Sequence, residues 1–398
     1  MCFGCILQEY PVFTIPKSHP HTFPHTFPYL HPMSTPRILI ISNYHKIVPS
    51  RPEAEAMIQL HKQGVHLEII TLKDAAYTPI FRKAGITVHE KHPSKKRDIR
   101  ARKFIRQKLI DGKFNILHCF NSKASLNGIP AAKGLKVKIL LYRGFTGHLH
   151  WYDPSFYLKY GHPRVAGIWC IAKGVEELFH KQLFFKKAKT KVILKGHHPD
   201  WYKDVVEKKL EDEVDLPSDV LKLIIVANAR KMKGIPDLFK MTYHLPEDKP
   251  IHLFVVGNGM ESKDLNKIRT ASPNVDKIHM LGYRKDAQNL VKNADIFVLT
   301  SLFGEATTKA VIEAMSLKTM PLVTDIPGNR DLVLDKKSGR VVPVGKPRLM
   351  AKVVLELFND RNQINELSSE AQNFVNEEFH TSKTVTELKN WYSELADS

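Results

Sequence analysis

Residues 294–343 read ADIFVLTSLFGEATTKAVIEAMSLKTMPLVTDIPGNRDLVLDKKSGRVVP, and this stretch decides the fold. Its short apolar run at residues 296–299 has polar neighbours, which is typical of a strand buried on both faces of a parallel sheet. A helical pattern of apolar residues follows at 310–315, and a second apolar run begins at Leu322. This order predicts a βαβ unit whose polar groups gather where the first strand ends and the helix begins.

Two glutamates, Glu305 and Glu313, lie at this junction between strand and helix. In one continuous helix they would be ~12 Å apart along the axis. We instead expect Glu305 in the loop and Glu313 about two turns into the helix, with Thr307 or Thr308 as the helix cap. The N–H groups at the capped end suit a phosphate, and both carboxylates could accept hydrogen bonds from sugar hydroxyls. On spacing alone, two glutamates near one helix are more often a solvated face.

The composition is that of a globular protein, with 398 residues of which 43% are apolar and 25% are charged. This length suggests two domains of ~150–200 residues. No apolar run approaches ~18 residues, so we expect no transmembrane helix. Cys2 and Cys5 lack the partner pair of a metal site, and the four cysteines form no disulfide framework. A reducing, cytosolic compartment is therefore expected.

The charge is uneven along the chain, whose formal net charge is +19. Residues 1–200 hold 32 lysines and arginines against 12 acidic residues, whereas the remainder holds 28 against 29. The whole excess therefore lies in the first half. Such an excess indicates an anionic partner for that half, which could be acidic lipid, a phosphorylated glycan or nucleic acid.

Residues 1–32 contain four histidines among prolines and phenylalanines, without helix or strand periodicity. Proline at this density blocks a helix or a central strand, and the segment lacks the basic start and apolar core of a signal peptide. A histidine cluster can bind metal, but we expect residues 1–32 to be a disordered extension before a natural start at Met33.

The rest of the first half, residues 33–200, is predicted to be an α/β domain because strand-length apolar runs alternate with helical segments. Strands are expected near residues 37–42, 67–71, 85–88, 116–119, 139–142, 167–171 and 192–194. After the first strand come Arg51 and Glu53, which could bind substrate or form a helix-capping ion pair.

A strongly basic segment lies within residues 91–113, with eight lysines and arginines between Lys95 and Lys108. Its apolar residues recur at near-helical spacing: Ile99, Phe104, Ile105, Leu109 and Ile110. The pattern predicts a basic amphipathic helix. Such a helix could contact an anionic surface, or it could pack its apolar face and leave a solvated basic face. A second basic run spans Lys186 to Lys191.

A charged, proline-interrupted segment at residues 201–220 is expected to be a linker. Beyond it, strands are predicted near residues 223–227, 251–257, 278–282, 296–299 and 322–324. They recur every ~20–30 residues, as in βαβ units. Residues 221–380 should therefore form a doubly wound sheet, whose ligands bind beyond the carboxyl ends of the strands.

The second half resembles the retaining, nucleotide-sugar-dependent glycosyltransferases with the GT-B fold, known as family four or group 1. The family's signature is a glutamate, seven residues and then Glu-Ala-Met, which Glu305 and residues 313–315 match. The resemblance covers roughly residues 37–395 and is strongest over 223–345. The chain departs from the pattern at Ala306 and Lys318, where glycines are usual, and at Met320. A glycine at position 306 would let the backbone approach a diphosphate closely.

The resemblance implies two Rossmann-like domains that face each other across a cleft, with a C-terminal helix at 381–398 crossing back to the first domain. It also implies transfer of a hexosyl group from a nucleoside diphosphate sugar to an acceptor hydroxyl, without a metal or another cofactor. The expected acceptor is a cell-surface glycan or a lipid-linked glycan precursor. Given the basic first half, we expect it to be anionic and to be met in the cytoplasm, peripherally at the inner face of the membrane, with no nucleic acid as partner.

The resemblance further assigns roles to single residues. Glu305 would hold the sugar hydroxyls and Glu313 the ribose, while His148 is the preferred candidate for a catalytic histidine near the sugar. The other expected donor-binding residues are Arg230, Lys233 (or Lys231 in its place), Gly234, Gly257, Gly282, Tyr283, Thr307 and Thr308. Ordinary turn glycines, exposed turn cations and a plain loop histidine are the alternatives. On the acceptor side, Arg143 joins Arg51 and Glu53.

Two other functional classes fit parts of this pattern. A nucleotide-sugar epimerase can share the architecture, and it would produce an epimer without any acceptor. A non-enzymatic binder of anionic polymers would account for the basic half and would give salt-sensitive gel shifts. The basic runs contain no recognisable RNA-binding motif, which counts against the second class.

Overall fold

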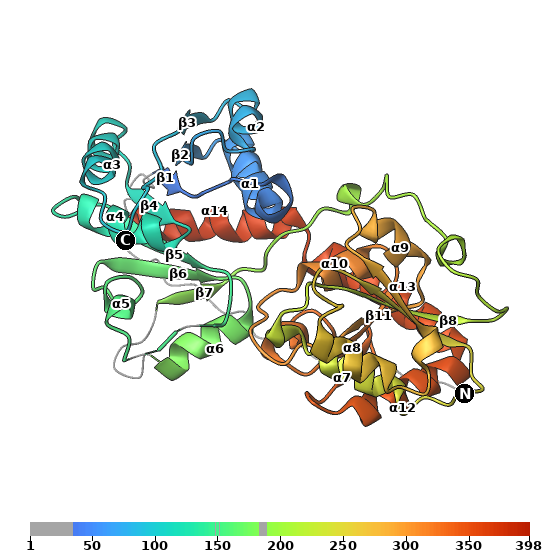
Figure 1. Cartoon of the computed structure of the whole chain (residues 1–398). Helices are drawn as coiled ribbons and strands as arrows, with labels where there is room; N and C mark the ends of the chain where they lie inside the picture. Colours follow the sequence, from blue (N-terminus) through green and yellow to red (C-terminus); the bar gives the residue numbers. More distant parts are fainter. Residues whose placement is uncertain (1–34, 148, 151, 183–188) are drawn as a thin grey trace, which may run out of the picture. The chain divides into compact units, whose positions relative to one another are not determined.

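The computed structural model describes residues 35–147, 149–150, 152–182 and 189–398, and residues 34–398 form one compact unit (Figure 1). Three subjects of the sequence predictions lie outside the described residues: the extension at 1–32, the candidate His148, and Lys186 and Lys187 of the second basic run.

The first sheet has seven strands in the order β3-β2-β1-β4-β5-β6-β7, and all neighbouring strands are parallel. The strands are β1 (Arg37–Ile41), β2 (His66–Ile70), β3 (Thr87–His89), β4 (Ile116–Cys119), β5 (Lys138–Arg143), β6 (Val165–Cys170) and β7 (Thr190–Val192). The sheet grows outward from β1 in both directions, so it is doubly wound, as the sequence predicts.

The second sheet has six parallel strands in the order β10-β9-β8-β11-β12-β13. The strands are β8 (Leu221–Val226), β9 (Ile251–Val256), β10 (Ile278–Gly282), β11 (Ile296–Leu299), β12 (Met320–Thr324) and β13 (Arg340–Val342). The order of connection reverses between β8 and β11. Ligands of such sheets bind beyond the carboxyl ends of the strands at this switch point.

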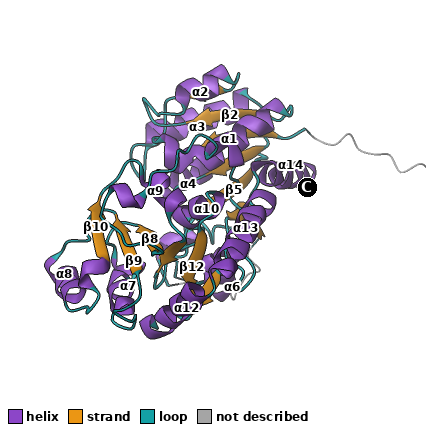
Figure 2. Cartoon of the chain, turned by 90° about the vertical axis from the view of Figure 1, so that its right-hand side faces the viewer, coloured by secondary structure: helices purple, strands orange, loops and turns teal. Residues whose placement is uncertain are grey.

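Helices connect the strands of both sheets (Figure 2). The α-helices are α1 (Ile47–Lys62), α2 (Thr78–Lys83), α3 (Ile99–Asp111), α4 (Ser122–Ala131), α5 (Pro154–Tyr157), α6 (Lys173–Gln182), α7 (Ile235–Thr242), α8 (Lys263–Thr270), α9 (Ala287–Asn293), α10 (Lys309–Ser316), α11 (Pro327–Arg330), α12 (Pro347–Asn359), α13 (Arg361–Glu378) and α14 (Thr381–Asp397). Short 3₁₀ helices are η1 (Pro199–Trp201), η2 (Leu210–Asp212), η3 (Lys231–Lys233) and η4 (Val275–Lys277).

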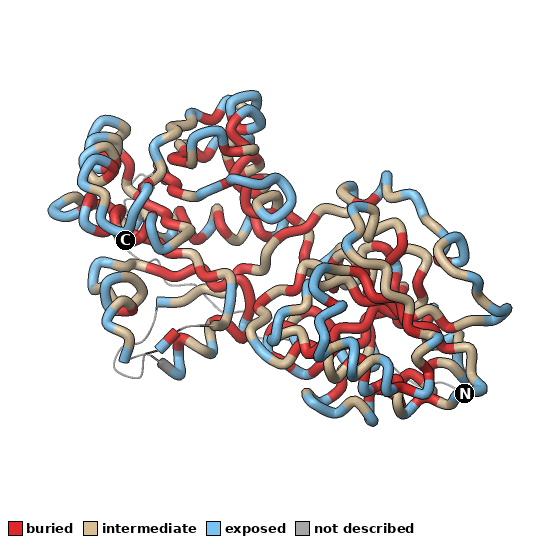
Figure 3. Tube along the Cα trace, in the orientation of Figure 1, coloured by how far each residue is buried: buried red, intermediate tan, exposed pale blue. Residues whose placement is uncertain are grey.

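The central strands carry the core. Every residue of β4, β9, β11 and β12 is buried (Figure 3), because helices cover both faces of these parallel sheets. This explains why their sequences are continuous apolar runs with little alternation. Among the described residues, no helix is long and apolar enough to cross a membrane.

Helix α14 packs against α1 of the first half. On α14 the Tyr392 hydroxyl lies 2.7 Å from His118 Nδ1 on β4, and both side chains are fully buried. Burial lowers the pKa of His118 to about 3, so the imidazole is neutral and its Nδ1 can accept a hydrogen bond from the Tyr392 hydroxyl. The C-terminal helix is therefore anchored on the first sheet.

The segment at 201–220, expected to be a linker, packs closely against the second sheet. Leu210 is fully buried in an apolar cluster with strand residues of that sheet. Arg284, which follows β10, donates two hydrogen bonds to Glu213, at 2.7 and 2.9 Å, and two to Asp286, at 2.8 and 2.7 Å. These contacts tie the segment to the loop after β10.

Helix α3 confirms a helix in the basic segment but corrects its predicted apolar face. Ile105 and Leu109 are buried, together with Ala101, whereas Ile99 is 68% and Ile110 49% exposed. Ile99 is the first residue of the helix, and Ile110 lies ~140° around the axis from Ile105, given 100° per residue. Neither can reach the packed side.

Replacing Arg284 with methionine is expected to lower the free energy of unfolding by about 1–3 kcal/mol at pH 7. The hydrogen bonds from Arg284 and Lys208 hold the pKa of Glu213 at about 2, below its usual 4.5. This stabilisation is present above pH 4.5 and is lost as the pH falls toward 2. Urea unfolding should therefore show a smaller difference from wild type at pH 3 than at pH 7, and an equal difference would contradict the assignment.

Lys318, where the family has glycine, follows α10 with φ +63, a left-handed conformation that strains any residue with a Cβ atom. Lys318→Gly is therefore expected to raise the free energy of unfolding by about 1 kcal/mol. Lys318→Ala keeps the strain and serves as the control, with little gain expected in denaturant titration. A glycine variant no more stable than the alanine variant would refute this explanation.

Candidate active site

Two loops meet at the switch point of the second sheet, one after β8 and one after β11. The backbone N–H of Leu302 donates to Met232 O at 2.7 Å, and the Thr300 hydroxyl donates to Lys233 O at 2.9 Å. Gly234 has φ +62, and a Cβ atom there would lie 2.1 Å from Thr300 O. Only glycine fits this approach, so Gly234 lets the two loops lock together.

Lys233 and Glu305 form an ion pair across these loops. Lys233 Nζ lies 2.5 Å from Glu305 Oε1, and the Ser301 hydroxyl donates to the same oxygen at 3.1 Å. The Lys233 and Glu305 side chains are only 17% and 11% exposed. Arg230 and Lys231 are exposed, and within the described part of the chain their side chains have no hydrogen-bond or ion-pair partner. Lys233 is thus the cation placed beside Glu305.

Glu313 lies on α10, where it pairs with Lys309 one turn earlier and accepts a hydrogen bond from Gln288 Nε2 at 2.7 Å. Its side chain is 16% exposed. Each of the two glutamates therefore has a lysine of its own. The predictions missed Ser301 and Lys309, although each lies four residues before its glutamate, a spacing that the sequence contains. Gln288 lies 25 residues before Glu313, so no local spacing in the sequence indicates their contact.

The start of α10 corrects one prediction. Thr308 occupies the N-cap position with an extended backbone, but neither threonine hydroxyl caps the helix. The Thr308 hydroxyl lies 3.4 Å from Asn329 Oδ1, and the Thr307 hydroxyl donates to Ile171 O at 3.2 Å. Both hydroxyls are directed to partners outside the helix, so the first turn of α10 keeps its amide groups free of a side-chain cap.

The glycines predicted at the strand ends differ in how strictly they are required. At Gly257, φ is +145 and a Cβ atom would lie 1.6 Å from Ala227 O, so a side chain is excluded. At Gly282, φ is +64 but a Cβ atom would meet open space, and the next residue, Tyr283, is 62% exposed. Gly257 therefore brings strand ends together, whereas Gly282 only shapes its turn.

Ala306, which replaces a glycine of the family pattern, lies in relaxed backbone, since it is not among the residues with positive φ. The close backbone approach occurs nearby instead. A Cβ atom on Gly328 would lie 2.5 Å from the carbonyl oxygens of both Glu305 and Ala306. Alanine at 306 therefore costs no strain, and Gly328 of α11 fixes the backbone of the loop.

The acceptor-side candidates are held by other protein groups. Glu53 accepts from the Tyr142 hydroxyl at 2.6 Å and pairs with Lys195 at 2.9 Å, so the capping ion pair with Arg51 is absent. Arg51 instead stacks on Trp201, 4.5 Å from the ring centroid. Arg143 donates to Phe145 O at 2.8 Å and to Gly147 O, and its guanidinium stacks on the Phe145 ring. Arg143 thus orders the loop that leads to His148.

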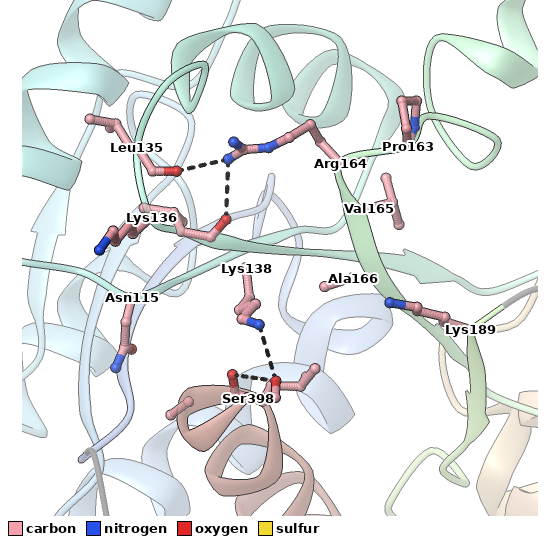
Figure 4. Close-up of a pocket in the computed structure, with 13 residues that line it drawn as sticks. Asn115, Leu135, Lys136, Lys138, Pro163, Arg164, Val165, Ala166, Lys189 and Ser398 are labelled. Carbon is pink, nitrogen blue, oxygen red and sulfur yellow. Dashed lines mark hydrogen bonds between the residues drawn. The ribbon is translucent and has the colours of Figure 1, made fainter.

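A hollow of about 630 Å³ lies elsewhere, at the amino ends of β5 and β6 (Figure 4). Two of the basic side chains that line it already have partners within the protein. Arg164 donates hydrogen bonds to Leu135 O and Val137 O, and Lys138 donates to the Ser398 hydroxyl. Ligands of doubly wound sheets bind at the opposite, carboxyl ends. The switch point between β8 and β11 is therefore the stronger candidate. Among the described residues, no group of three or more His, Cys, Asp or Glu side chains could hold a metal ion.

Two doubly wound parallel sheets, each with its own switch point, are the architecture of the GT-B fold. Residues 185–374, just under half of the chain, match the family model described as Glycosyl transferases group 1. The sequence resemblance and the predicted fold class are thereby confirmed.

Solved structures support the fold. HepE from Anabaena, crystallised with UDP, superposes with a TM-score of 0.74 at 15% identity, covering 90% of this chain and 100% of that one. A glycosyltransferase from Rickettsia africae gives a TM-score of 0.72 at 17% identity, covering 91% and 98%.

Sequence relatives point the same way. An Escherichia coli UDP-Gal:alpha-D-GlcNAc-diphosphoundecaprenol alpha-1,3-galactosyltransferase is 24% identical, over 71% of this chain and 76% of its own length. An uncharacterized glycosyltransferase from Methanocaldococcus jannaschii is 25% identical, over 57% of this chain and 58% of its own length.

Proposed function

We propose that this chain transfers a sugar from a nucleoside diphosphate sugar to an acceptor hydroxyl, with retention of anomeric configuration. The observation that carries the proposal is the position of Lys233 and Glu305, side by side at the switch point, with Glu305 four residues before the start of α10. A diphosphate leaving group needs positive charge and N–H donors where its charge develops. Lys233, Arg230 and the amides at the start of α10 supply both.

The other roles follow from this placement. Glu305 would accept hydrogen bonds from sugar hydroxyls, and Glu313, fixed by Gln288 and Lys309, would hold the ribose. Gly234 and Gly257 would shape the donor site by letting the backbone segments that carry it pack closely against each other. Tyr283, exposed after β10, is within the proposed donor site, and His148 stays the predicted catalytic histidine beside the sugar.

The proposed donor carries UDP, and the proposed acceptor is a glycan or a lipid-linked glycan precursor. Support for UDP comes from HepE, which was crystallised with UDP, UDP and glucose, or UDP-glucose. Support for the acceptor comes from two Escherichia coli relatives, the alpha-D-GlcNAc-diphosphoundecaprenol galactosyltransferase and an O-antigen biosynthesis glycosyltransferase.

The basic surface at the start of α3 supports an anionic acceptor at an acidic membrane. A hollow of about 860 Å³ is lined by four cationic side chains: Lys91, Lys95, Arg97 and Arg100. Within the described part of the chain these four form no close ion pair, although Lys95 interacts electrostatically with Asp98. Asp98 accepts hydrogen bonds from Ser94 and Ala101, and Glu90 pairs with Arg82. The hollow therefore keeps its positive charge, and the exposed Ile99 beside it could enter the apolar boundary of a membrane. We place the enzyme in the cytoplasm, peripherally at the inner face of that membrane.

A panel of nucleotide sugars tests the proposed function directly. The donor should raise the melting temperature of the protein, and adding lipid-linked acceptor should release nucleoside diphosphate and yield a glycosylated product. Glu305→Gln should keep the fold and lower turnover about a hundredfold or more, as expected for loss of a transition-state contact. An epimerised sugar without acceptor, or a nearly normal rate in the variant, would reject the proposal.

Replacing Arg230 and Lys233 together with alanine is expected to weaken UDP binding at least about tenfold, because each removes a charge-assisted contact to phosphate. Binding of uridine, which has no phosphate, should change little. Calorimetry on both ligands measures the difference, and Lys240→Ala on α7 is a control for charge loss. Equal losses for UDP and uridine would mean that the pair does not contact phosphate.

Reversing Lys95, Arg97 and Arg100 to glutamate is expected to abolish sedimentation with anionic vesicles, since each basic residue at such a surface contributes ~1 kcal/mol. Wild-type binding should weaken as salt rises, because the Debye length is only ~8–10 Å near physiological salt. Reversing Lys240, Lys263 and Lys267, exposed on the second half, is the matched control. Salt-independent binding, or equal binding to neutral vesicles, would reject the membrane contact.

A further inference from the structure

Lys233 has two prospective partners at one position. Its Nζ atom is 2.5 Å from the Glu305 carboxylate, which Ser301 also holds at 3.1 Å. Under the proposed function, on which this inference rests, the same ammonium group binds the donor's diphosphate. A lysine ammonium is a compact point charge with three donors, so a carboxylate and a phosphate group compete for it.

The backbone on both sides of the pair is fixed. Lys233 O accepts from the Thr300 hydroxyl, and Gly234 lies against Thr300 O. Glu305 O lies against Gly328, where a Cβ atom would be only 2.5 Å away. Any exchange of partners must therefore come from the two side chains, which lie on loops that stay in place.

The intact donor and the spent nucleotide differ in what they offer to Glu305. When a nucleoside diphosphate sugar binds, Lys233 moves from Glu305 to the phosphate. The hydroxyl groups of the sugar then donate hydrogen bonds to the Glu305 carboxylate and replace the lost lysine contact. A nucleoside diphosphate supplies none, so Glu305 is left partly buried without its cation, and such a group is costly.

We infer that Glu305 competes with the diphosphate for Lys233 and thereby weakens binding of the released nucleotide relative to the intact donor. Loss of the sugar returns Lys233 to Glu305 and promotes product release. Glu305 is then a residue that discriminates donor from product, in addition to holding the sugar. A ligand favours one of two arrangements only through its different interactions with them, and here the sugar hydroxyls provide the difference.

Glu313 provides the internal contrast. It carries its own lysine, Lys309, and the amide of Gln288, so it does not draw on Lys233. Removing its charge should not strengthen UDP binding, and loss of the ribose contact should weaken it. Two glutamates in one segment are thus expected to change UDP affinity in opposite directions.

Calorimetric titration with UDP is the test. Glu305→Gln should bind UDP about five- to tenfold more tightly than wild type, as expected when a close charge pair no longer has to be broken, and its product inhibition by UDP should strengthen equally. Glu313→Gln should bind UDP more weakly. Glu356→Gln, which removes a distant exposed carboxylate paired with Arg340, is the charge control and should leave UDP affinity unchanged.

Testing Glu305→Gln in a Lys233→Ala variant distinguishes competition for Lys233 from simple charge repulsion between Glu305 and the diphosphate. In Lys233→Ala, the gain from adding Glu305→Gln should fall to less than half, because there is no lysine left to release. Ser301→Ala, which loosens the carboxylate without removing it, should tighten UDP binding by a smaller factor and stands in if the glutamine variant does not fold. Unchanged or weaker UDP binding by Glu305→Gln, with normal binding by wild type, overturns this inference alone. Failure of wild type to bind UDP overturns the proposed donor site itself.

Discussion

The close contact between the loops after β8 and β11 is the constraint on which the proposed site depends. Thr300 and Leu302 bond the backbone of Lys233 and Met232, and Gly234 permits the contact because it lacks a Cβ atom. This contact brings Lys233 of one loop beside Glu305 of the other. A larger residue at position 234 would push the two loops apart and separate Lys233 from Glu305.

The uneven distribution of charge between the halves matches the different roles proposed for them: donor binding by the second half and contact with an anionic partner by the first. The second half is nearly neutral, with 28 basic and 29 acidic residues, and its proposed donor site uses two cations and the amides of one helix. Many carboxylates there already pair with neighbouring lysines or arginines, as in the cluster of Arg284, Glu213 and Asp286. On the first half, Lys91, Lys95, Arg97 and Arg100 line a hollow at the start of α3 and form no close ion pair within the described part of the chain. Its charge is therefore available to a partner outside the chain.

Sequence patterns predicted the two parallel sheets because buried strands require continuous apolar runs, as at β9 and β11. They placed Glu305 and Lys233 at strand ends, but not in contact, because the contact depends on β8 and β11 being neighbours, and their paired residues are 73 positions apart in the chain. The contacts of Glu53 with Tyr142 and Lys195 likewise depend on partners remote in the chain. Periodicity carries no information about such partners.

The most direct test of the central claim is a crystal structure of the protein with UDP bound. We predict that the diphosphate lies at the start of α10, with Lys233 Nζ within ~3 Å of a phosphate oxygen and the Glu305 carboxylate turned away from it. The loop backbone from Thr300 to Ala306 should not move. A diphosphate bound elsewhere, with the Lys233–Glu305 pair intact, would contradict both the placement of the site and the roles assigned to its residues.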